Sequence, residues 1–578
     1  MIEREYIMAN KKEIVRALEQ IALYLEILGE NSFKVSAYRK AANALEGDER
    51  TMDQIEDVSK IKGIGKGTAA VIIEMMDKGE SELLIELQEK VPSELITLLQ
   101  VPNLGGKKIA KLYSELGVTN IETLKEACTA GKVRELAGFG AKTEEKILAS
   151  LDDIGKRPER LPIAYMLPIA ESIESQLEKM KYIEKFSRAG SLRRYRETIK
   201  DLDFIISSKN PGKVKEQLLN LQGVTDVIAS GDTKVSLVLG EKMAVSVDFR
   251  IVEPEQFATT LHHFTGSMEH NVKMRQLAKT RGEKISEYGV ENTETGEVRT
   301  FETEEEFYAY FGLNWIPPEA RETGEEIELL IEDYEFVQLS DIKADLHLHS
   351  TWSDGAFSIE EMAEEARSLG YEFMAITDHS QFLRVANGLT PERIRMQRKE
   401  IDKLNEKYKD FKIFAGIEMD ILPDGTLDYD DDLLDEMDFV IASIHSAFSQ
   451  DKSKIMKRLK TALDHKKVDL IAHPTGRLIG RRTGYDVDVD MLLQLAYETD
   501  TAIELNANPN RLDLSPDWLR KAQDLGVKIA INTDAHYKET MKHMEIGAAV
   551  ARKGFIKKSS VINTMTLKEF ETYLNRKK

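Results

Sequence analysis

The sequence is poor in cysteine and has no long apolar run. Its single cysteine, Cys128, excludes a disulfide framework and suits the reducing conditions of the cytoplasm. No apolar stretch approaches the length of a membrane span, and the charged N-terminal residues form no signal core. We therefore expect a globular cytoplasmic protein that has no membrane partner.

The composition is compatible with several domains and with a nucleic-acid partner. The 578 residues are 42% hydrophobic and 31% charged, which is typical of folded domains of roughly 100 to 200 residues each. The net charge of −21 taken alone argues against nucleic acid. The charge is segregated, however: acidic runs lie at 302–307 and 428–438, whereas basic clusters surround Arg39, Lys107 and Arg193. Local patches decide phosphate contact, so nucleic acid stays open as a partner.

Residues 1–150 have the apolar spacing of helices, interrupted by similar glycine-containing breaks at 61–67, 101–107 and 136–142. The breaks resemble the helix-hairpin-helix motif, whose glycines turn the backbone with positive φ and whose amides bind a DNA phosphate without reading bases. One match is also typical of a packing corner between helices, but three favour DNA binding. The resemblance assigns phosphate contacts to Gly63, Gly65, Gly105, Lys107, Gly138 and Gly140.

Residues 151–252 change to a mixture of helix and strand patterns, which predicts an α+β domain. Asp201 and Asp203 are two residues apart in a strand-like run, so their side chains share one face of the strand. A later run carries Asp248, and an adjacent pairing would bring the three carboxylates together. Such a group repels itself unless divalent cations neutralise it. The Gly190–Ser191 turn upstream offers amides and a hydroxyl to a phosphate.

From residue 342 onward, short apolar runs repeatedly end on side chains that bind metals. They end at DLHLH, ITDH, GIEMD, SIHS, IAHP, IELN and NTDAH, which contain more than half of the chain's eleven histidines. A parallel β/α barrel gathers strand-end residues at one rim, so the pattern predicts an α/β barrel with the site of a metal-dependent hydrolase. The nine candidate ligands are His347, His349, Asp354, His379, Glu418, His445, His473, Asp534 and His536.

Residues 1–322 resemble the family X DNA polymerases, which include DNA polymerase beta. The shared features are GS-x(9)-DxD at 190–203, HFTGS at 263–267 with Asn271 and Arg275 downstream, NWIPPEARE at 314–322, and NSFKVSAYRKAA at 31–42. The resemblance implies helix-hairpin-helix domains followed by a polymerase-beta-like palm and thumb. It also implies DNA-template-directed synthesis from dNTPs.

The resemblance assigns roles to individual residues. Asp201, Asp203 and Asp248 would be catalytic ligands of two Mg²⁺ or Mn²⁺ ions, with Asp248 nearest the attacking primer oxygen. Ser191 and Arg194 would hold the triphosphate. The other nucleotide-binding positions are Phe264 and Gly266 at the sugar, and Asn271 and Arg275 on the minor-groove side of the new base pair. A downstream 5′-phosphate would be bound by Lys34, Tyr38 and Arg39.

Three positions depart from the family pattern. Lys200 replaces the usual glycine beside Asp201, and His263 replaces the usual tyrosine beside the sugar. Val71 stands at a position that is expected to carry the lyase lysine. A valine cannot form a Schiff base, which argues against lyase activity.

Residues 342 to about 560 resemble the PHP (polymerase and histidinol phosphatase) family. The resemblance implies a distorted (β/α)7 barrel that holds up to three divalent ions, with Glu418 bridging two of them and both His349 and Glu418 acting in catalysis. The residue types alone do not choose between Zn²⁺, Mn²⁺ and Fe²⁺. A water bound at such a centre deprotonates and attacks phosphorus. Arg477 in HPTGR would either steady a substrate phosphate or form a structural ion pair.

Together the resemblances predict a multidomain protein, α+β and then α/β, that fills gaps in base excision repair and has its own 3′–5′ exonuclease. Incision at abasic sites is a possible second activity of the barrel. The expected partners are gapped or nicked duplex DNA, dNTPs and a DNA ligase that receives the product; we expect a monomer. The predicted domains are a helix-hairpin-helix domain at 1–90, fingers at 91–152, a palm at 153–252, a thumb at 253–322, a linker at 323–341 and the barrel at 342–578.

Three other functions stay open on the residues alone. They are a small-metabolite phosphatase with a DNA-binding but inactive N-terminal part, a template-independent nucleotidyltransferase acting on RNA, and a structural DNA-binding scaffold. The three carboxylates and the HFTGS segment disfavour the phosphatase. The many metal-binding side chains disfavour the scaffold.

Overall fold

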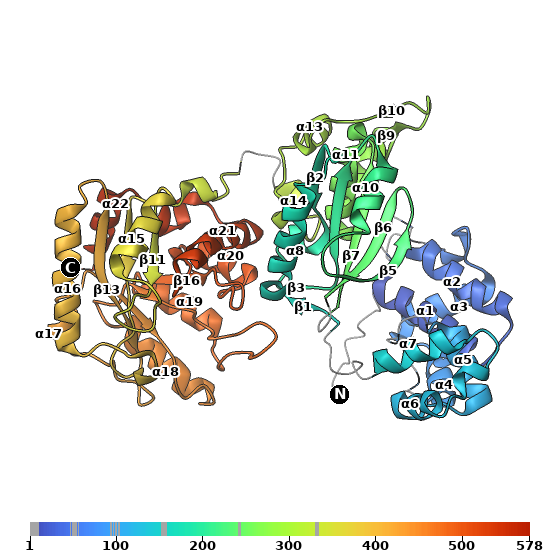
Figure 1. The fold of residues 1–578 in the computed structure, drawn as a ribbon, viewed down its shortest axis with the longest axis horizontal. Helices are drawn as coiled ribbons and strands as arrows, with labels where there is room; N and C mark the ends of the chain where they lie inside the picture. Colours follow the sequence, from blue (N-terminus) through green and yellow to red (C-terminus); the bar gives the residue numbers. More distant parts are fainter. Residues whose placement is uncertain are drawn as a thin grey trace. The chain divides into compact units, whose positions relative to one another are not determined.

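The computed structural model describes residues 11–46, 48, 52, 55, 57–92, 95, 98, 101, 104–151, 159–240, 244–329 and 334–577. Backbone contacts divide the chain into two compact units, 1–158 and 159–578, whose elements are labelled in Figure 1. Within these described ranges, no helix combines the length and the apolar character needed to cross a membrane.

The first unit is helical where it is described. Its helices are α1 (Lys11–Ile27), α2 (Ser32–Glu46), α3 (Lys66–Lys78), α4 (Glu82–Lys90), α5 (Gly106–Leu116), α6 (Ile121–Thr129) and α7 (Ala141–Leu151). On α1, Ile14, Leu18, Ile21 and Leu25 recur at helical spacing and are buried. Helix α1 contacts α2, α3, α4 and α5, so this apolar stripe lies at the centre of the core.

The second unit begins with a five-stranded sheet of order β2-β4-β7-β6-β5. The strands are β2 (Lys185–Arg188), β4 (Leu202–Ser207), β5 (Val224–Ser230), β6 (Lys234–Leu239) and β7 (Val245–Val252). Strands β4 and β7 are parallel, and the other neighbouring pairs are antiparallel. Phe204 of β4 is buried in the core that contains α8 (Ile163–Leu177) and α10 (Pro211–Leu218). Because side chains alternate along a strand, Asp203 faces the other side.

A second group of elements follows this sheet. It comprises α11 (Phe257–Thr265), α12 (Met268–Thr280), β8 (Glu283–Ser286), β9 (Gly289–Asn292), β10 (Val298–Arg299), α13 (Glu304–Tyr310) and α14 (Glu326–Leu329). Arg321 is fully buried and pairs with Glu304 at 2.6 Å. Helix α14 lies within the predicted linker, and its buried Glu326 contacts His270 Nδ1 at 2.6 Å. Residues 330–333 of that linker lie outside the described residues.

Seven parallel strands in chain order form the last part of the second unit. They are β11 (Ala344–Leu348), β12 (Phe373–Ile376), β13 (Lys412–Asp420), β14 (Phe439–Ser443), β15 (Leu470–Ile471), β16 (Ala502–Asn506) and β17 (Ile529–Asn532). A parallel bridge between Leu348 and Ala535 joins the first strand to the end of the last, so the sheet is nearly closed into a barrel.

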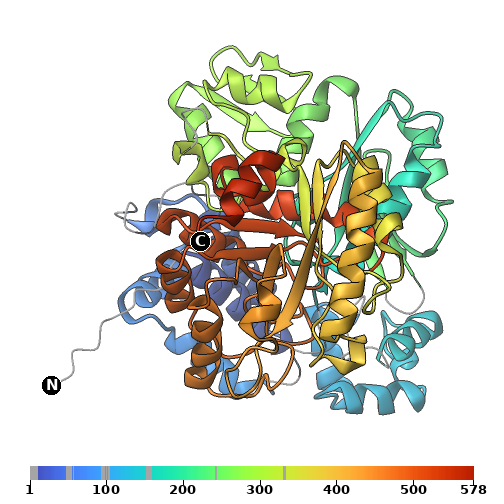
Figure 2. The same cartoon turned by 90° about the vertical axis from the view of Figure 1, so that its left-hand side faces the viewer.

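Helices cover the outside of this barrel (Figures 1 and 2). They are α15 (Ile359–Ser368), α16 (Pro391–Lys407), α17 (Asp431–Leu434), α18 (Lys452–Leu463), α19 (Val489–Glu498), α20 (Pro516–Leu525), α21 (Met544–Lys553) and α22 (Leu567–Leu574). Phe570 of α22 stacks on Phe373 with ring centroids 4.9 Å apart. Phe373 is the first residue of β12, so α22 closes the end at which the strands begin.

The structure confirms the predicted order of a helical region, an α+β region and an α/β barrel. The strand-like runs at 202–208, 225–231 and 234–240 correspond to β4, β5 and β6. The run at 243–252 contains β7, although Met243 lies outside the described residues.

Candidate functional site

The carboxyl ends of the barrel strands bring the predicted metal ligands to one rim. His347 lies on β11, and His349 directly follows that strand. Glu418 lies on β13. The loop after β11 supplies Asp354, and the ends of β12, β14, β15 and β17 supply His379, His445, His473, Asp534 and His536.

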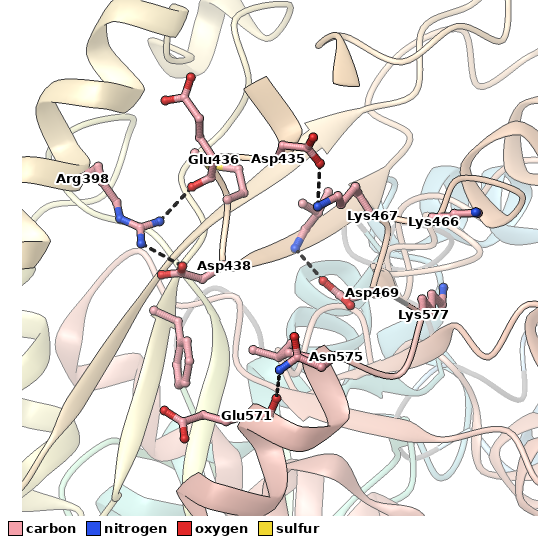
Figure 3. Close-up of a pocket in the computed structure, with 14 residues that line it drawn as sticks. Arg398, Asp435, Glu436, Asp438, Lys466, Lys467, Asp469, Glu571, Asn575 and Lys577 are labelled. Atoms are coloured by element: carbon pink, nitrogen blue, oxygen red, sulfur yellow. Dashed lines mark hydrogen bonds and ion pairs between the residues drawn. The ribbon is translucent and has the colours of Figure 1, made fainter. Parts of the chain in front are cut away.

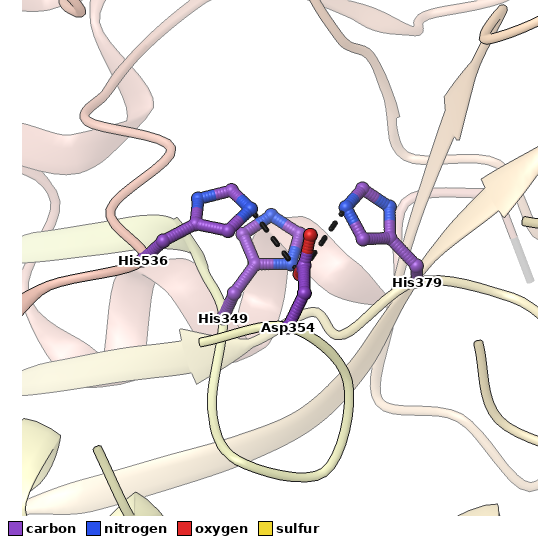
Figure 4. Close-up of side chains that lie close together, drawn as sticks. All are labelled: His349, Asp354, His379 and His536. Carbon is purple, nitrogen blue, oxygen red and sulfur yellow. Dashed lines mark ion pairs between the residues drawn. The ribbon is translucent and has the colours of Figure 1, made fainter. Parts of the chain in front are cut away.

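The ligand atoms of eight of these nine residues form groups that are small enough to hold metal ions, whereas His473 belongs to none of the groups. In each group, all ligand atoms lie within 4.8 Å of one another. The groups are His349, Asp354, His379 and His536, which Figure 4 shows; His347, His349 and Asp534; and His379, Glu418 and His445. His349 and His379 each belong to two groups, so the three groups overlap at the rim.

Glu418 occupies the centre of the rim. Its side chain is fully buried, with Oε2 at 2.8 Å from His379 Nδ1 and Oε1 at 2.9 Å from His473 Nε2. Burial would raise the pKa of Glu418, but His445, His347 and His379 outweigh burial and hold this pKa well below its usual value. An ionised carboxylate whose two oxygens face different imidazoles is suited to bridge two metal ions.

Several buried ring nitrogens of the rim have no hydrogen-bond partner among the described residues. They include His347 Nε2, both ring nitrogens of His349, and His473 Nδ1. Buried polar atoms are rarely left unpaired, whereas a neutral imidazole is a common ligand for Zn²⁺ and Fe²⁺. Burial lowers the pKa of His349 to about 3, so this ring is neutral at pH 7. The donor set therefore fits divalent metal ions.

Sequence reasoning missed a carboxylate that holds the ligands in place. Glu504 is fully buried and lies 2.7 Å from His347 Nδ1, and it accepts a hydrogen bond of 2.6 Å from the His473 backbone amide. Asn532 donates to the same carboxylate at 3.1 Å. Asp420 likewise lies 3.3 Å from His445 Nδ1. Both acids lie in strand motifs, Glu504 in IELN and Asp420 at the end of GIEMD, so the pattern that predicted the ligands also contains the residues that orient them.

Arg477 forms a structural ion pair, which is one of the two roles predicted for it. Its Nη2 pairs with Glu197 Oε1 at 2.6 Å, and its Nε donates to the Arg511 carbonyl at 3.0 Å. Arg511, which sequence reasoning did not select, has its Nε 3.5 Å from the metal-ligand candidate Asp534. Arg511 is therefore the arginine placed next to the ligand cluster.

A large cavity lies at the opposite end of the barrel. It has a volume of about 650 Å³ and is lined by charged residues, as Figure 3 shows. These charges pair locally: Arg398 lies 2.9 Å from Asp438, and Lys467 lies 2.6 Å from Asp435. The cavity is therefore lined by paired surface charges, and it does not contain the histidine-rich rim.

The three predicted polymerase carboxylates lie near one another at the palm sheet. Asp203 and Asp248 stand opposite each other on the parallel strands β4 and β7, and Asp201 immediately precedes β4. Burial, followed by the charges of Asp201 and Asp248, raises the pKa of Asp203 to about 7. Lys234 pairs with Asp248 at 2.7 Å. Divalent cations would relieve the repulsion among the three carboxylates, so these oxygen ligands fit such cations.

The Gly190–Ser191 turn lies against the same carboxylates. Gly190 has a φ of +58°, and a Cβ at this position would lie 2.2 Å from Asp203 Oδ2. Ser191 lies in α9 (Gly190–Arg193), and Arg194 ends this helix. The Arg194 guanidinium contacts the Thr265 carbonyl and lies 3.2 Å from Glu322.

The other predicted nucleotide-binding residues surround the end of α11. Gly266 is adjacent to Arg194, because a Cβ on Gly266 would lie 3.3 Å from Arg194 Nη1. Phe264 packs under the Arg250 guanidinium at 4.4 Å. Asn271 donates to the His263 carbonyl at 2.7 Å, and Arg275 stands one helical turn after Asn271 on α12.

The hairpin glycines fall into two conformational classes. Gly63 and Gly138 have positive φ values of 112° and 92°, as predicted for the motif. The same expectation is wrong for Gly65, Gly105 and Gly140. Gly65 and Gly105 have φ values of −92° and −94°, because they are extended N-cap residues of α3 and α5, and Gly140 also lacks a positive φ. At Gly65, Gly105, Gly138 and Gly140, an added Cβ would meet no described atom within 4 Å, which leaves the backbone open to a ligand. Lys107 lies in the first turn of α5.

The predicted 5′-phosphate residues lie on α2 and already have internal contacts. Arg39 pairs with Glu26 at 2.7 Å, and Lys34 lies 3.7 Å from Glu30. Tyr38 is buried, and burial raises the pKa of its hydroxyl. Val71 is also buried in the helical core, so its side chain does not reach a ligand.

Comparison with known proteins agrees with this architecture. Family models match residues 9–81 (helix-hairpin-helix domain), 95–153 (SAM-like helix-hairpin-helix tandem), 260–322 (DNA polymerase beta thumb) and 345–508 (PHP domain). "DNA polymerase/3′-5′ exonuclease PolX" of Bacillus subtilis (strain 168) is 60% identical over 567 residues, which cover 98% of this chain and 100% of that protein. A "Probable phosphatase" of Thermoanaerobacter sp. (strain X514) is 29% identical over 245 residues, which cover 40% of this chain and 95% of that protein. A "Probable phosphatase" of Acetivibrio thermocellus is 26% identical over 243 residues, with the same two shares.

Proposed function

The chain belongs to the PolX family, the family X DNA polymerases with a C-terminal PHP domain, and on this premise we propose a DNA-template-directed DNA polymerase that has its own 3′–5′ exonuclease. The observation that carries the proposal is the presence of two acid-rich sites in one chain. Asp203 and Asp248 stand opposite each other on β4 and β7, and Asp201 directly precedes β4. At the barrel rim, eight of the nine metal-ligand candidates form compact groups, and the ninth, His473, contacts Glu418. The first arrangement suits formation of a phosphodiester bond, and the second suits its hydrolysis.

In the polymerase site, Asp201, Asp203 and Asp248 would hold two Mg²⁺ or Mn²⁺ ions. When bound, these cations lower the pKa of the primer 3′-hydroxyl and neutralise the charge of the triphosphate. Arg194 would bind the triphosphate as a planar donor, and its Nη1 lies next to Gly266. The remaining nucleotide contacts would come from Ser191, Phe264, Asn271 and Arg275.

In the barrel site, the nine rim residues would hold up to three Zn²⁺, Mn²⁺ or Fe²⁺ ions. When bound, such ions generate a hydroxide nucleophile from water at neutral pH. Glu418 would be a ligand shared by two of these ions, and Glu504 keeps the His347 ring in one orientation. His349, which belongs to two of the ligand groups, would be a ligand of one of these ions.

The two activities can be separated by Asp201→Ala and His349→Ala in the full-length protein. On a gapped duplex with Mn²⁺, Asp201→Ala should still shorten the primer but should not extend it. His349→Ala should extend the primer without shortening it. Normal extension by Asp201→Ala would show that the polymerase site is misassigned, and normal shortening by His349→Ala would show the same for the nuclease.

Two matched variants control for unspecific damage. Asp232→Ala removes an exposed palm carboxylate that pairs with Lys215. His465→Ala removes a barrel histidine that pairs with Asp431 away from the rim. Both controls should retain both activities.

The finer role that we propose is the filling of short gaps during base excision repair. The helix-hairpin-helix regions would hold gapped or nicked duplex DNA through Lys107 and the hairpin amides, and Lys34, Tyr38 and Arg39 would hold the downstream 5′-phosphate. The nick that remains would pass to a DNA ligase. We also propose incision at abasic sites by the barrel, a monomeric state, and a cytoplasmic location that suits the free, buried Cys128.

A phosphatase of small metabolites is the second candidate. The two "Probable phosphatase" relatives match 40% of this chain, which favours a common barrel chemistry. Rapid hydrolysis of histidinol phosphate with no incorporation of dNTPs would support this candidate against the polymerase.

A further inference from the structure

The segment that links the nucleotide-binding turn to the palm carboxylates is held by side chains of the PHP domain. Lys553 Nζ donates to the Arg194 carbonyl at 3.1 Å. Arg477 pairs with Glu197 at 2.6 Å, three residues further along the same segment. Two side chains from distant parts of the barrel domain therefore contact one short palm segment between Ser191 and Asp201.

Lys553 also contacts the carboxylate that holds the Arg194 guanidinium. It is the last residue of α21, it is largely buried, and its Nζ pairs with Glu322. Glu322 Oε1 accepts from Arg194 Nε at 3.2 Å, and Glu322 Oε2 lies 2.6 Å from Arg196 Nη1. The largely buried Glu322 carboxylate thus pairs with three cations, and only Arg196 among them is about half exposed.

The contacts of Glu322 with Lys553 and the two arginines determine how strongly the Arg194 guanidinium can attract a ligand. Burial opposes ionisation of Glu322, but Lys553 and then Arg194 outweigh it and lower the pKa of the carboxyl. Without Lys553, the ionised Glu322 would be shared by Arg194 and Arg196 alone. Its attraction for the Arg194 guanidinium would then be stronger, and a triphosphate would have to compete with it.

We propose that Lys553 of the PHP domain is a positioning residue of the polymerase site. It shares Glu322 with Arg194 and holds the Arg194 backbone, so the guanidinium stays available to the triphosphate of an incoming nucleotide. The barrel domain thereby contributes to nucleotide affinity as well as to hydrolysis. This inference rests on the proposed role of Arg194 in triphosphate binding.

The test uses the full-length protein and steady-state extension of a gapped duplex. Lys553→Met should raise the KM for dNTP about tenfold, the size expected for one charge-assisted contact. The kcat and the exonuclease rate should change less than about twofold, because Lys553 contacts neither reacting group. Lys553→Arg should restore most of the affinity. Lys542→Met should behave as wild type, because Lys542 forms an exposed ion pair of 3.9 Å with Glu171 between the same two domains.

A double variant tests the mechanism itself. If Lys553 acts by sharing Glu322, then Lys553→Met combined with Glu322→Gln should return the KM to near the wild-type value. A KM that stays raised in the double variant would overturn the proposal, as would an unchanged KM in Lys553→Met. If Lys553→Met does not fold, Glu322→Gln alone decides: a KM no higher than wild type supports the proposal, and a raised KM overturns it.

Arg194→Gln distinguishes failure of the role proposed for Lys553 from failure of the role proposed for Arg194 in triphosphate binding. A raised KM in Arg194→Gln together with an unchanged KM in Lys553→Met would overturn the role of Lys553 and keep Arg194 as a triphosphate ligand. An unchanged KM in Arg194→Gln would overturn the assignment of Arg194, and the role of Lys553 with it.

Discussion

Replacing Glu504 by glutamine tests whether a residue outside the predicted ligand set controls the barrel site. The Glu504 carboxylate can only accept a hydrogen bond from His347 Nδ1, which lies 2.7 Å away. That bond keeps the proton on Nδ1 and leaves Nε2 free to bind a metal. Glutamine has the same shape, but its amide can donate to Nδ1 and so move the ring proton to Nε2.

The expected loss follows from the contacts of Glu504. Removal of a carboxylate that orients a metal-binding histidine typically costs about 10- to 100-fold in metal affinity or activity. A hydrogen bond to a charged group contributes about 1.5–3 kcal/mol, which corresponds to a similar range of rates. We therefore expect Glu504→Gln to lower nucleotide release from a labelled 3′ end by about 10- to 100-fold. The assay is a Mn²⁺ titration, because weaker metal binding should shift the midpoint to higher concentration.

Two comparisons make this result specific. Primer extension by the same preparation should be unchanged, because Glu504 lies in the barrel and not in the palm. Glu498→Gln, an exposed substitution on α19, should behave as wild type in both assays. A rate of nucleotide release within twofold of wild type at every Mn²⁺ concentration would refute the reasoning.

Three further predictions concern other parts of the chain. Gly190→Ala should lower primer extension about a hundredfold, because the added Cβ would meet Asp203 Oδ2 at 2.2 Å and displace it. Glu304→Gln should destabilise the protein at pH 7 by about 3–5 kcal/mol, measured by denaturant unfolding, because it leaves the buried Arg321 without its charged partner. Burial opposes ionisation of Glu304, but Arg321 outweighs burial and lowers the pKa of this carboxyl. The stabilisation by the ion pair is therefore fully present above the unfolded pKa of about 4.5. It is lost as the pH falls through the pKa of Glu304 in the folded protein. Lys107→Glu should weaken duplex binding and reduce its salt slope by about one.

Each of these predictions has a matched control and a contradicting outcome. Gly212→Ala places a Cβ where no described atom lies within 4 Å, and it should extend primers normally. Glu305→Gln and Lys90→Glu change exposed charges and should leave stability and DNA affinity unchanged. Wild-type extension by Gly190→Ala would contradict the close approach to Asp203. A stability difference between Glu304→Gln and wild type that stays constant from pH 7 to strongly acidic pH would contradict the pKa argument, and an unchanged salt slope would contradict phosphate contact at Lys107.

The barrel and its ligand rim could be predicted because one geometric rule connects sequence to space. Parallel strands end at the same rim, so each strand-end motif places its polar residues near the others. The palm needed one more step, since Asp248 is far from Asp203 in sequence. Alternation along the strands indicated which face each acid occupies, and the parallel register of β4 and β7 supplied the pairing.

Other features could not be read from local patterns. Glu504 stands in a strand-end motif like the ligands. Whether such a buried acid binds a metal or orients a histidine depends on small differences in the position of its carboxylate, which the sequence does not give. The bond from Lys553 to Arg194 joins residues 359 positions apart, and its motif resembles an ordinary basic helix end. The conformations of Gly65 and Gly105 depend on where each helix begins, and helix boundaries are the least predictable feature of a sequence.

The most direct measurement is the number of divalent ions bound per chain, by element-resolved analysis of the purified protein after equilibration with Mn²⁺. We predict that the barrel of the wild-type protein retains up to three ions and that His473→Ala retains fewer, because His473 contacts the central Glu418 at 2.9 Å. Asp201→Ala should retain the barrel ions. A wild-type protein that binds no ion, or a His473→Ala variant that keeps the full number, would contradict a metal-dependent barrel.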